Sequence, residues 1–190
     1  MTTIGRPPTK AARTRGALLA AAFELFGQQG YEQTTVAQIA KAVGVTEITF
    51  YRHFGSKDQL LVEDPYDPLI TKAISEQPAG LPPLARAVRG IRTAWRGMPI
   101  GDDEPVRERV AIASATPSLL PALRASTAAT EAAIAQQLVA DGADATAAAI
   151  AAAAAMAALM TGLMRWAVTD DGPLGAAIER SLNVLEPADD

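Results

Sequence analysis

The fold class is decided by residues 35–54, TVAQIAKAVGVTEITFYRHF. Thr35 suits the N-cap of a helix, and Gln38 follows three residues later, which is the spacing of a capping box. Apolar residues then recur on one helical stripe until Gly44, which can adopt the left-handed conformation that ends a helix. Thr46 is a second N-cap residue, and the helix it begins runs to the next glycine. The stretch therefore predicts two short helices joined by a tight turn.

Helical spacing continues on both sides of this stretch. Before it, a polar arm is expected over residues 1–12, followed by a helix from about Thr14 that Gly27 and Gly30 end. After it, helices are predicted at about 57–63, 69–76, 83–97, 103–114, 117–139, 143–168 and 173–185. No stretch alternates with the period of two that is typical of a strand. The chain is therefore predicted to be all-α.

Composition narrows the chemistry that this chain can perform. Of its 190 residues 49% are hydrophobic, which is enough for a packed core, and none is cysteine. The absence of cysteine excludes a disulfide scaffold, cysteine-ligated zinc, iron–sulfur clusters and thiol nucleophiles. The single histidine, His53, leaves little for a catalytic triad or a metal centre, and no glycine-rich phosphate loop or hydrolase motif is present. No enzymatic activity, metal or cofactor is predicted.

Charge divides the chain unevenly. Residues 1–60 carry seven Lys or Arg against four acidic side chains, whereas residues 61–190 carry ten against seventeen. A basic N-terminal third on an acidic body favours a polyanionic partner for the first part only. The alternative is an uneven solvated surface.

The segment Ala145–Met164 contains no charged residue and is long enough to cross a bilayer. Most of it is alanine, which contributes little to membrane insertion compared with larger apolar residues. A buried helix is therefore expected here, and no membrane partner.

Two short helices behind a bracing helix make a helix-turn-helix, whose second helix can lie in the major groove of DNA. Phe50 and Phe54 stand four residues apart and are expected to face inward. Mostly hydrogen-bonding side chains then face outward, namely Thr46, Glu47, Thr49, Arg52 and His53, with Tyr51 at the edge. Residues 35–60, with the run FYRHF followed by SKDQL, resemble the DNA-binding signature of the TetR family of bacterial regulators. The resemblance covers roughly Ala11–Thr71.

The resemblance implies a domain organisation and a set of DNA contacts. Residues 13–60 would form a three-helix DNA-binding domain, with the helix-turn-helix at about 35–54, and residues 61–190 a larger ligand-binding and dimerisation domain. Phosphate contacts are expected at Thr35, Tyr51, His53 and Lys57, and base contacts at Ala37, Glu47, Ile48 and Thr49.

Several of these residues have a second interpretation. Ile48 could contact a thymine methyl group, and Glu47 could accept from a cytosine amino group or point away from the bases. Taken singly, His53 could be an ordinary surface residue and Tyr51 a packing residue. Arg6 could enter the minor groove as an arm, and the alternative is a disordered tail.

A single short recognition helix reads only a few base pairs, so two copies on a palindromic operator are expected. The resemblance implies that the last two helices, at about 143–168 and 173–185, form a four-helix interface with a second copy. Their many alanines suit that role because small side chains let helix axes approach closely.

The helical body could also bind a small molecule. Methionines recur every four residues at 156, 160 and 164, and a soft apolar pocket is expected from Tyr66, Trp95, Met98, Met160 and Trp166. The alternative for these residues is core or dimer seam. Three arginines, Arg92, Arg96 and Arg107, could bind an anionic head group or be solvated.

The function predicted is that of a homodimeric, sequence-specific regulator that binds double-stranded DNA in the cytoplasm. A repressor is expected, relieved by a small apolar or amphipathic effector. The alternative is a helical dimeric adaptor, or small-molecule-binding protein, that does not bind DNA.

Overall fold

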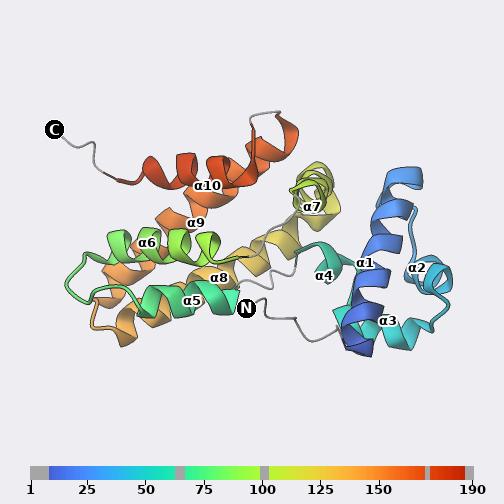
Figure 1. Ribbon diagram of the computed structural model, residues 1–190, viewed down its shortest axis with the longest axis horizontal. Helices are drawn as coiled ribbons and strands as arrows, with labels where there is room; N and C mark the ends of the chain where they lie inside the picture. Colours follow the sequence, from blue (N-terminus) through green and yellow to red (C-terminus); the bar gives the residue numbers. More distant parts are fainter. Residues whose placement is uncertain (1–8, 63–66, 99–102, 170–171, 187–190) are drawn as a thin grey trace, which may run out of the picture. The chain divides into compact units, whose positions relative to one another are not determined.

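The computed structural model describes residues 9–62, 67–98, 103–169 and 172–186. These residues form ten α-helices, one short 3-10 helix and no strand, so the predicted all-α class is confirmed (Figure 1). The chain divides into two compact units, Met1–Leu61 and Val62–Asp190. Arg6 and Tyr66, which the sequence proposes for DNA and ligand contacts, lie outside the described residues.

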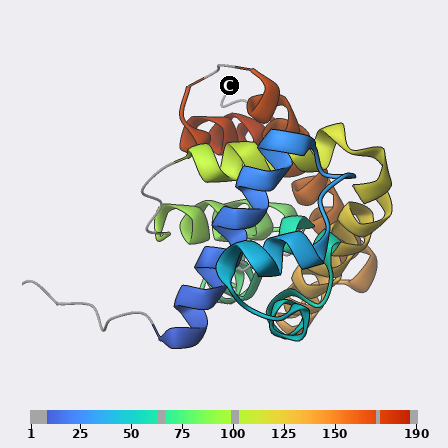
Figure 2. The same cartoon turned by 90° about the vertical axis from the view of Figure 1, so that its right-hand side faces the viewer.

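The first unit is built on one long helix and three short ones: α1 (Lys10–Gln29), α2 (Val36–Val43), α3 (Glu47–Phe54) and α4 (Lys57–Val62). The shorter α2 packs beside α1, as Figure 2 shows for the dark blue and lighter blue helices. Apolar side chains from all four helices are buried in this unit: Leu18, Ala22, Phe26, Ile39, Ala40, Phe50, Phe54, Leu60 and Leu61. The buried residues of α1 and α2 recur at helical spacing, and Phe50 and Phe54 of α3 face inward as predicted.

Local capping sets the helix-turn-helix. Both hydrogen bonds of the capping box between Thr35 and Gln38 are present, and the Thr46 hydroxyl accepts from the Thr49 amide. Gly44 ends α2 with φ 73° and ψ 30°, a left-handed conformation that costs glycine little. The turn and both predicted helices are therefore confirmed.

The predicted arm of residues 1–12 extends too far. Helix α1 already begins at Lys10, because the Thr9 hydroxyl accepts from the Ala12 amide and caps it one turn earlier than the apolar stripe suggests. The helix also continues past Gly27 and ends at Gly30, whose φ is 82°. An isolated glycine within a helix costs about 1 kcal/mol relative to alanine, which the packing of α1 overcomes.

The second unit contains α5 (Asp67–Ser75), α6 (Pro83–Arg96), α7 (Glu104–Ala115), a 3-10 helix (Pro117–Leu119), α8 (Leu120–Ala140), α9 (Ala145–Val168) and α10 (Leu174–Asn183). The predicted helix at 117–139 thus begins with a 3-10 turn, and Pro173 is the N-cap of α10 rather than its first residue. Helix α9 contacts α6, α7, α8 and α10 and forms the centre of this unit.

Glycine allows two pairs of helices to approach closely. A Cβ atom at Gly90 of α6 would lie 2.3 Å from the Ile74 side chain of α5, and one at Gly162 of α9 would lie 1.7 Å from Ser181 Oγ of α10. Neither position has room for a side chain. The α5–α6 and α9–α10 pairs therefore depend on these glycines.

Helix α9 is long and apolar enough to span a membrane by length and composition, with a mean hydropathy of 1.9 over 18 residues. Ala148, Ala152 and Ala155 are among its residues buried in the core of the second unit, as is typical of a core helix. Only 33% of the apolar window is buried within the chain, however. The remaining surface of α9 is alanine-rich and open.

Candidate nucleic-acid interface and internal cavity

Helix α3 presents a mixed apolar and polar outer face. Ile48 exposes 78% and Tyr51 48% of its surface, and Glu47 and Arg52 are also exposed. Thr49 is half-buried, and its hydroxyl lies 3.1 Å from that of Thr46. Ala37, on α2, is exposed as well. The residues expected at bases are thus accessible, with Thr49 the least so.

The inner face of α3 is rigidly anchored. Phe50 and Phe54 are buried, and their rings pack with centroids 5.3 Å apart. The Arg15 guanidinium of α1 stacks on Phe54 at 4.2 Å from its centroid and donates to the His53 carbonyl at 2.9 Å. Because Arg15 of α1 contacts both a ring and a carbonyl of α3, rotation of α3 about its axis would break these contacts. The outer face therefore has a set orientation within the first unit.

Two residues expected at phosphates are partly engaged within the protein. The Thr35 hydroxyl accepts from the Gln38 amide and lies 3.1 Å from Gln38 Oε1. His53 is half-buried next to Phe54, with ring centroids 6.4 Å apart. Thr35 remains exposed at the start of α2, whose first amide groups favour an anion.

Lys57 lies in the first turn of α4, as predicted, but its ammonium group is occupied. Nζ donates to the carbonyls of Tyr31 and Thr34, each at 2.8 Å, and lies 3.9 Å from the centroid of the Tyr31 ring. The Tyr31 hydroxyl in turn donates to the Asp58 carboxylate. Burial, followed by the hydrogen bond to Asp58, raises the pKa of Tyr31 well above its ordinary value of 10.0.

The second unit contains a partly open, mostly apolar cavity of about 70 Å³ beside Trp95 and Met98. Sequence reasoning found these two residues but missed most of the lining, which is completed by Ile70, Ile91, Val106, Arg109, Leu159, Leu163, Leu174 and Ile178. Leu159 and Leu163 of α9 could have been found from the sequence, because a spacing of four residues places both on one face of a helix.

The predicted pocket is only partly assembled. Trp166 is 1% exposed, its Nε1 donates to the Gly172 carbonyl at 2.9 Å, and it does not line the cavity beside Trp95. Met160 packs half-buried against the core and does not line that cavity either. Six positions along a helix place Trp166 about 120° around the axis from Met160, so the two point to different neighbours. Tyr66 lies outside the described residues.

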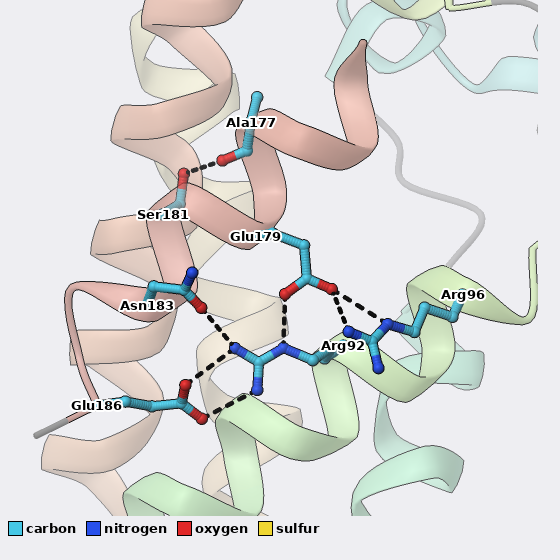
Figure 3. Close-up of polar contacts among 7 residues, drawn as sticks. All are labelled: Arg92, Arg96, Ala177, Glu179, Ser181, Asn183 and Glu186. Carbon is cyan, nitrogen blue, oxygen red and sulfur yellow. Dashed lines mark hydrogen bonds and ion pairs between the residues drawn. The ribbon is translucent and has the colours of Figure 1, made fainter. Parts of the chain in front are cut away.

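The three arginines considered for an anionic head group, Arg92, Arg96 and Arg107, all bond within the chain, and Arg96 is also solvated, with 67% of its side chain exposed. Arg92 of α6 donates from Nε to Glu179 at 2.7 Å and from Nη1 to Glu186 at 2.9 Å, and Arg96 donates to the same Glu179 at 2.7 Å (Figure 3). These bonds join α6 to α10 and to the residues that follow it. The hydrogen bond from Arg92 holds the pKa of the Glu186 carboxyl below its usual range.

Arg107, the third of these arginines, closes the end of α9. Its guanidinium stacks 4.3 Å from the Trp166 ring centroid and donates to the Trp166 and Thr169 carbonyls. A cation at a helix C-terminus is stabilised by the helix dipole.

An open groove of about 550 Å³ runs over α9 and α10. Four alanines line it, Ala154, Ala157, Ala158 and Ala177, together with Thr161, Gly162, Arg165, Trp166, Arg180, Ser181, Val184 and Leu185. Val184, at 81%, is the most exposed large apolar residue of the described chain, and Ile150 and Val168 extend the apolar surface along α9. Among the described residues no group of three His, Cys, Asp or Glu side chains could hold a metal ion.

Comparison with known proteins agrees with this architecture. The model of bacterial regulatory proteins of the tetR family matches residues 18–63, and that of the MftR C-terminal domain matches residues 82–189, more than half of the chain. The chain belongs to the TetR family. The first match covers the helix-turn-helix, and the second covers α6 to α10.

Curated HTH-type transcriptional regulators match half of this chain or less. The HTH-type transcriptional regulator TcmR of Streptomyces glaucescens is 44% identical over 90 residues, which is 46% of this chain and 39% of TcmR. The chain therefore matches less than half the length of this relative.

Solved structures match almost the whole chain. NalD, the secondary repressor of the MexAB-OprM multidrug efflux pump in Pseudomonas aeruginosa, is 25% identical with a TM-score of 0.60, over 93% of this chain and 96% of NalD. SmeT, the repressor of the SmeDEF pump of Stenotrophomonas maltophilia, is 18% identical with a TM-score of 0.58, over 93% and 92% of the two chains. The SmeT likeness shows a shared fold.

Proposed function

We propose that this TetR-family chain is a homodimeric, sequence-specific DNA-binding transcriptional regulator that acts in the cytoplasm, without enzymatic activity. The observation that carries the proposal is the outer face of α3. A branched apolar side chain, Ile48, is exposed there beside Tyr51 and Arg52, on a helix that buried phenylalanines hold in place. Folding alone gives no reason to expose this residue, whereas a DNA groove supplies methyl groups for it to contact.

The proposed contacts divide into two classes. Thr35, Tyr51 and His53 would bond to phosphates and set the register of the protein on the duplex. Ala37, Glu47, Ile48 and Thr49 would face base edges and select the sequence. Arg6 is proposed to enter the minor groove. Lys57, the fourth residue expected at phosphates, already bonds to backbone carbonyls within the first unit.

Dimerisation is proposed on the open face of α9 and α10. Helix α9 has 24 residues and is about 36 Å long, enough to contribute substantially to a standard interface. Its alanines and the exposed Ile150, Val168 and Val184 would bury apolar surface that the monomer leaves in water. Two recognition helices then read the two halves of a palindromic operator.

The effector is proposed to be a small apolar or amphipathic molecule that binds at the cavity beside Trp95 and Met98 and releases the operator. The cavity of about 70 Å³ is smaller than the roughly 300–1,000 Å³ of ordinary ligand sites, so binding must displace side chains. Release follows only if the effector binds the state without DNA more tightly. SmeT, which shares the fold, has been solved in complex with triclosan.

DNA binding can be tested by selecting duplexes from a pool with a randomised central segment. The regulator should enrich a palindromic motif whose half-sites lie about 34–36 Å apart. The Tyr51→Ala variant should bind that motif more weakly, as measured by fluorescence anisotropy. A dimer of native fold that enriches no sequence would instead support the helical adaptor.

Effector binding can be tested with anilinonaphthalene sulfonate, an apolar anion. In a Trp166→Phe background Trp95 is the single tryptophan, so quenching of its emission reports binding beside it. Leu163→Phe should abolish quenching by filling the cavity, whereas Val184→Ser, in the open groove, should retain it. The reverse pattern would contradict the cavity as effector site.

A further inference from the structure

The first turn of α4 is fastened to the loop between α1 and α2. Lys57 Nζ donates to two carbonyls of that loop, those of Tyr31 and Thr34, each at 2.8 Å. The neighbouring Asp58 accepts from the hydroxyl of the same tyrosine. Tyr31 is 7% exposed and also packs on Phe26 of α1, with ring centroids 5.2 Å apart. We refer to Tyr31, Lys57 and Asp58 as the clasp.

The clasp acts on the residues immediately before α2. Thr34 is 1% exposed, its hydroxyl donates to the Gly30 carbonyl at 2.9 Å, and its own carbonyl accepts from Lys57. Thr35, the N-cap of α2, follows directly in the chain. Thr34 is thus held at its hydroxyl by the bond to Gly30 and at its carbonyl by Lys57, so the clasp helps to set the place at which α2 begins.

The bonding capacity of the Lys57 ammonium is largely used. An ammonium group has three N–H donors, two of which go to carbonyls here, while the Tyr31 ring lies 3.9 Å away. If the Lys57 ammonium group moved away to reach a phosphate, the partly buried carbonyl oxygens of Tyr31 and Thr34 would lose their charged donor. Leaving such groups without a partner is costly, which favours retention of the clasp.

We propose that Lys57 is a positioning residue for DNA binding: it holds Thr35 and the start of α2 in place and does not itself contact a phosphate. This inference rests on the proposed function, since the position of α2 matters only if Thr35 and Ala37 meet DNA. It differs from the role that the family resemblance implies for this lysine.

The dependence of DNA affinity on salt separates the two roles. Lys57→Met and Tyr31→Phe are compared with wild type on the selected duplex between 50 and 200 mM salt, where each phosphate contact contributes about 0.9 to the slope of log K against log salt. We expect Lys57→Met to weaken binding about tenfold at every salt concentration without changing the slope. Tyr31→Phe, which alters no charge at neutral pH, should also weaken binding, about threefold.

The charge-matched control is Lys72→Met, which removes an exposed lysine of α5 that pairs with Glu76. It should leave both affinity and slope as in wild type. The proposal is overturned if Lys57→Met lowers the slope by about 1.8 for the two copies of a dimer while Tyr31→Phe binds like wild type.

Amide hydrogen exchange tests the clasp without DNA. The amides of residues 34–38 should exchange at least several-fold faster in Lys57→Met and Tyr31→Phe than in wild type, with the centre of α1 unchanged. Equal exchange in all proteins overturns the clasp. If wild type binds no duplex, the proposed function fails, and exchange still decides whether Lys57 positions this segment. Should Lys57→Met fail to fold, Tyr31→Phe supplies the same comparison.

Discussion

Ile48 exposes 78% of its surface on α3, and at the scale of single residues it is the clearest candidate for sequence selection. Its neighbours are the exposed Glu47 and the half-buried Thr49, whose polar groups water can also satisfy, so their accessibility has a simpler explanation. An apolar contact with a thymine methyl would bury roughly one methyl group, worth about 0.8 kcal/mol, or about fourfold in affinity.

The test replaces thymine by deoxyuridine, which lacks only that methyl group, at each position of the selected duplex in turn. Wild type should lose about fourfold in affinity at one position of each half-site. At that position, Ile48→Ala should bind the thymine duplex and the deoxyuridine duplex with equal affinity, as measured by fluorescence anisotropy. Equal binding by wild type at every position would contradict the contact.

Tyr31 gives the first unit a dependence on alkaline pH. Its pKa is raised in the folded protein by burial and by the hydrogen bond to Asp58, so the folded state favours the protonated phenol. The resulting stability is fully present below the unfolded-state pKa of about 10 and is lost as pH rises through the folded pKa. The free energy of unfolding should therefore fall above pH 10.

The measurement is urea unfolding of wild type and Tyr31→Phe at pH 8 and pH 11. Other groups titrate equally in both proteins, so their difference isolates this tyrosine. Wild type should lose more stability between the two pH values than Tyr31→Phe. A constant difference between the proteins would show that Tyr31 does not couple folding to pH.

At the scale of secondary-structure elements, α10 is held to α6 by charge rather than by apolar contact alone. Glu179, 30% exposed at its side chain, accepts from both Arg92 and Arg96, and Arg92 also bonds to Asn183 and Glu186 (Figure 3). Because α10 is proposed to contribute to the dimer face, this network also determines where that face lies within the second unit.

Glu179→Gln should destabilise the second unit by about 1–2 kcal/mol, because a partly buried carboxylate that serves two arginines is lost. Glu76→Gln is the matched control, since its pair with Lys72 is exposed at 59% and 73% and such pairs contribute about 0–1 kcal/mol. Thermal unfolding monitored by circular dichroism measures both. Equal effects of the two substitutions would count against the network.

At the scale of the whole molecule, the proposed operator binding requires two chains. Ala157 lies in the groove over α9 and α10 and is exposed in the monomer. A charge there costs nothing in the isolated chain but becomes buried and unpaired in a dimer, at several kcal/mol.

Ala157→Glu should therefore yield monomers by sedimentation and lower operator affinity at least about 100-fold, with helical content unchanged. Ala128→Glu introduces the same charge at an exposed alanine of α8 and should remain dimeric. If Ala157→Glu stays dimeric and binds DNA normally, the interface lies elsewhere.

Local sequence determined the helices and the helix-turn-helix. The caps at Thr35 and Thr46, the turn at Gly44 and the inward phenylalanines were predictable because each depends on residues no more than four positions apart. The start of α1 was placed late because Thr9 caps a polar first turn that carries no apolar signal.

Tertiary structure alone decided which distant residues meet. Trp95 and Met98 line a cavity with Leu159 and Leu163, whereas Trp166 is bonded elsewhere. Arg92 finds Glu186, 94 positions later, and Lys57 finds Thr34 across the clasp. Such partners depend on how each helix is rotated and packed against the next. Hydrophobic periodicity predicts which face of a helix is buried but not which helix covers that face.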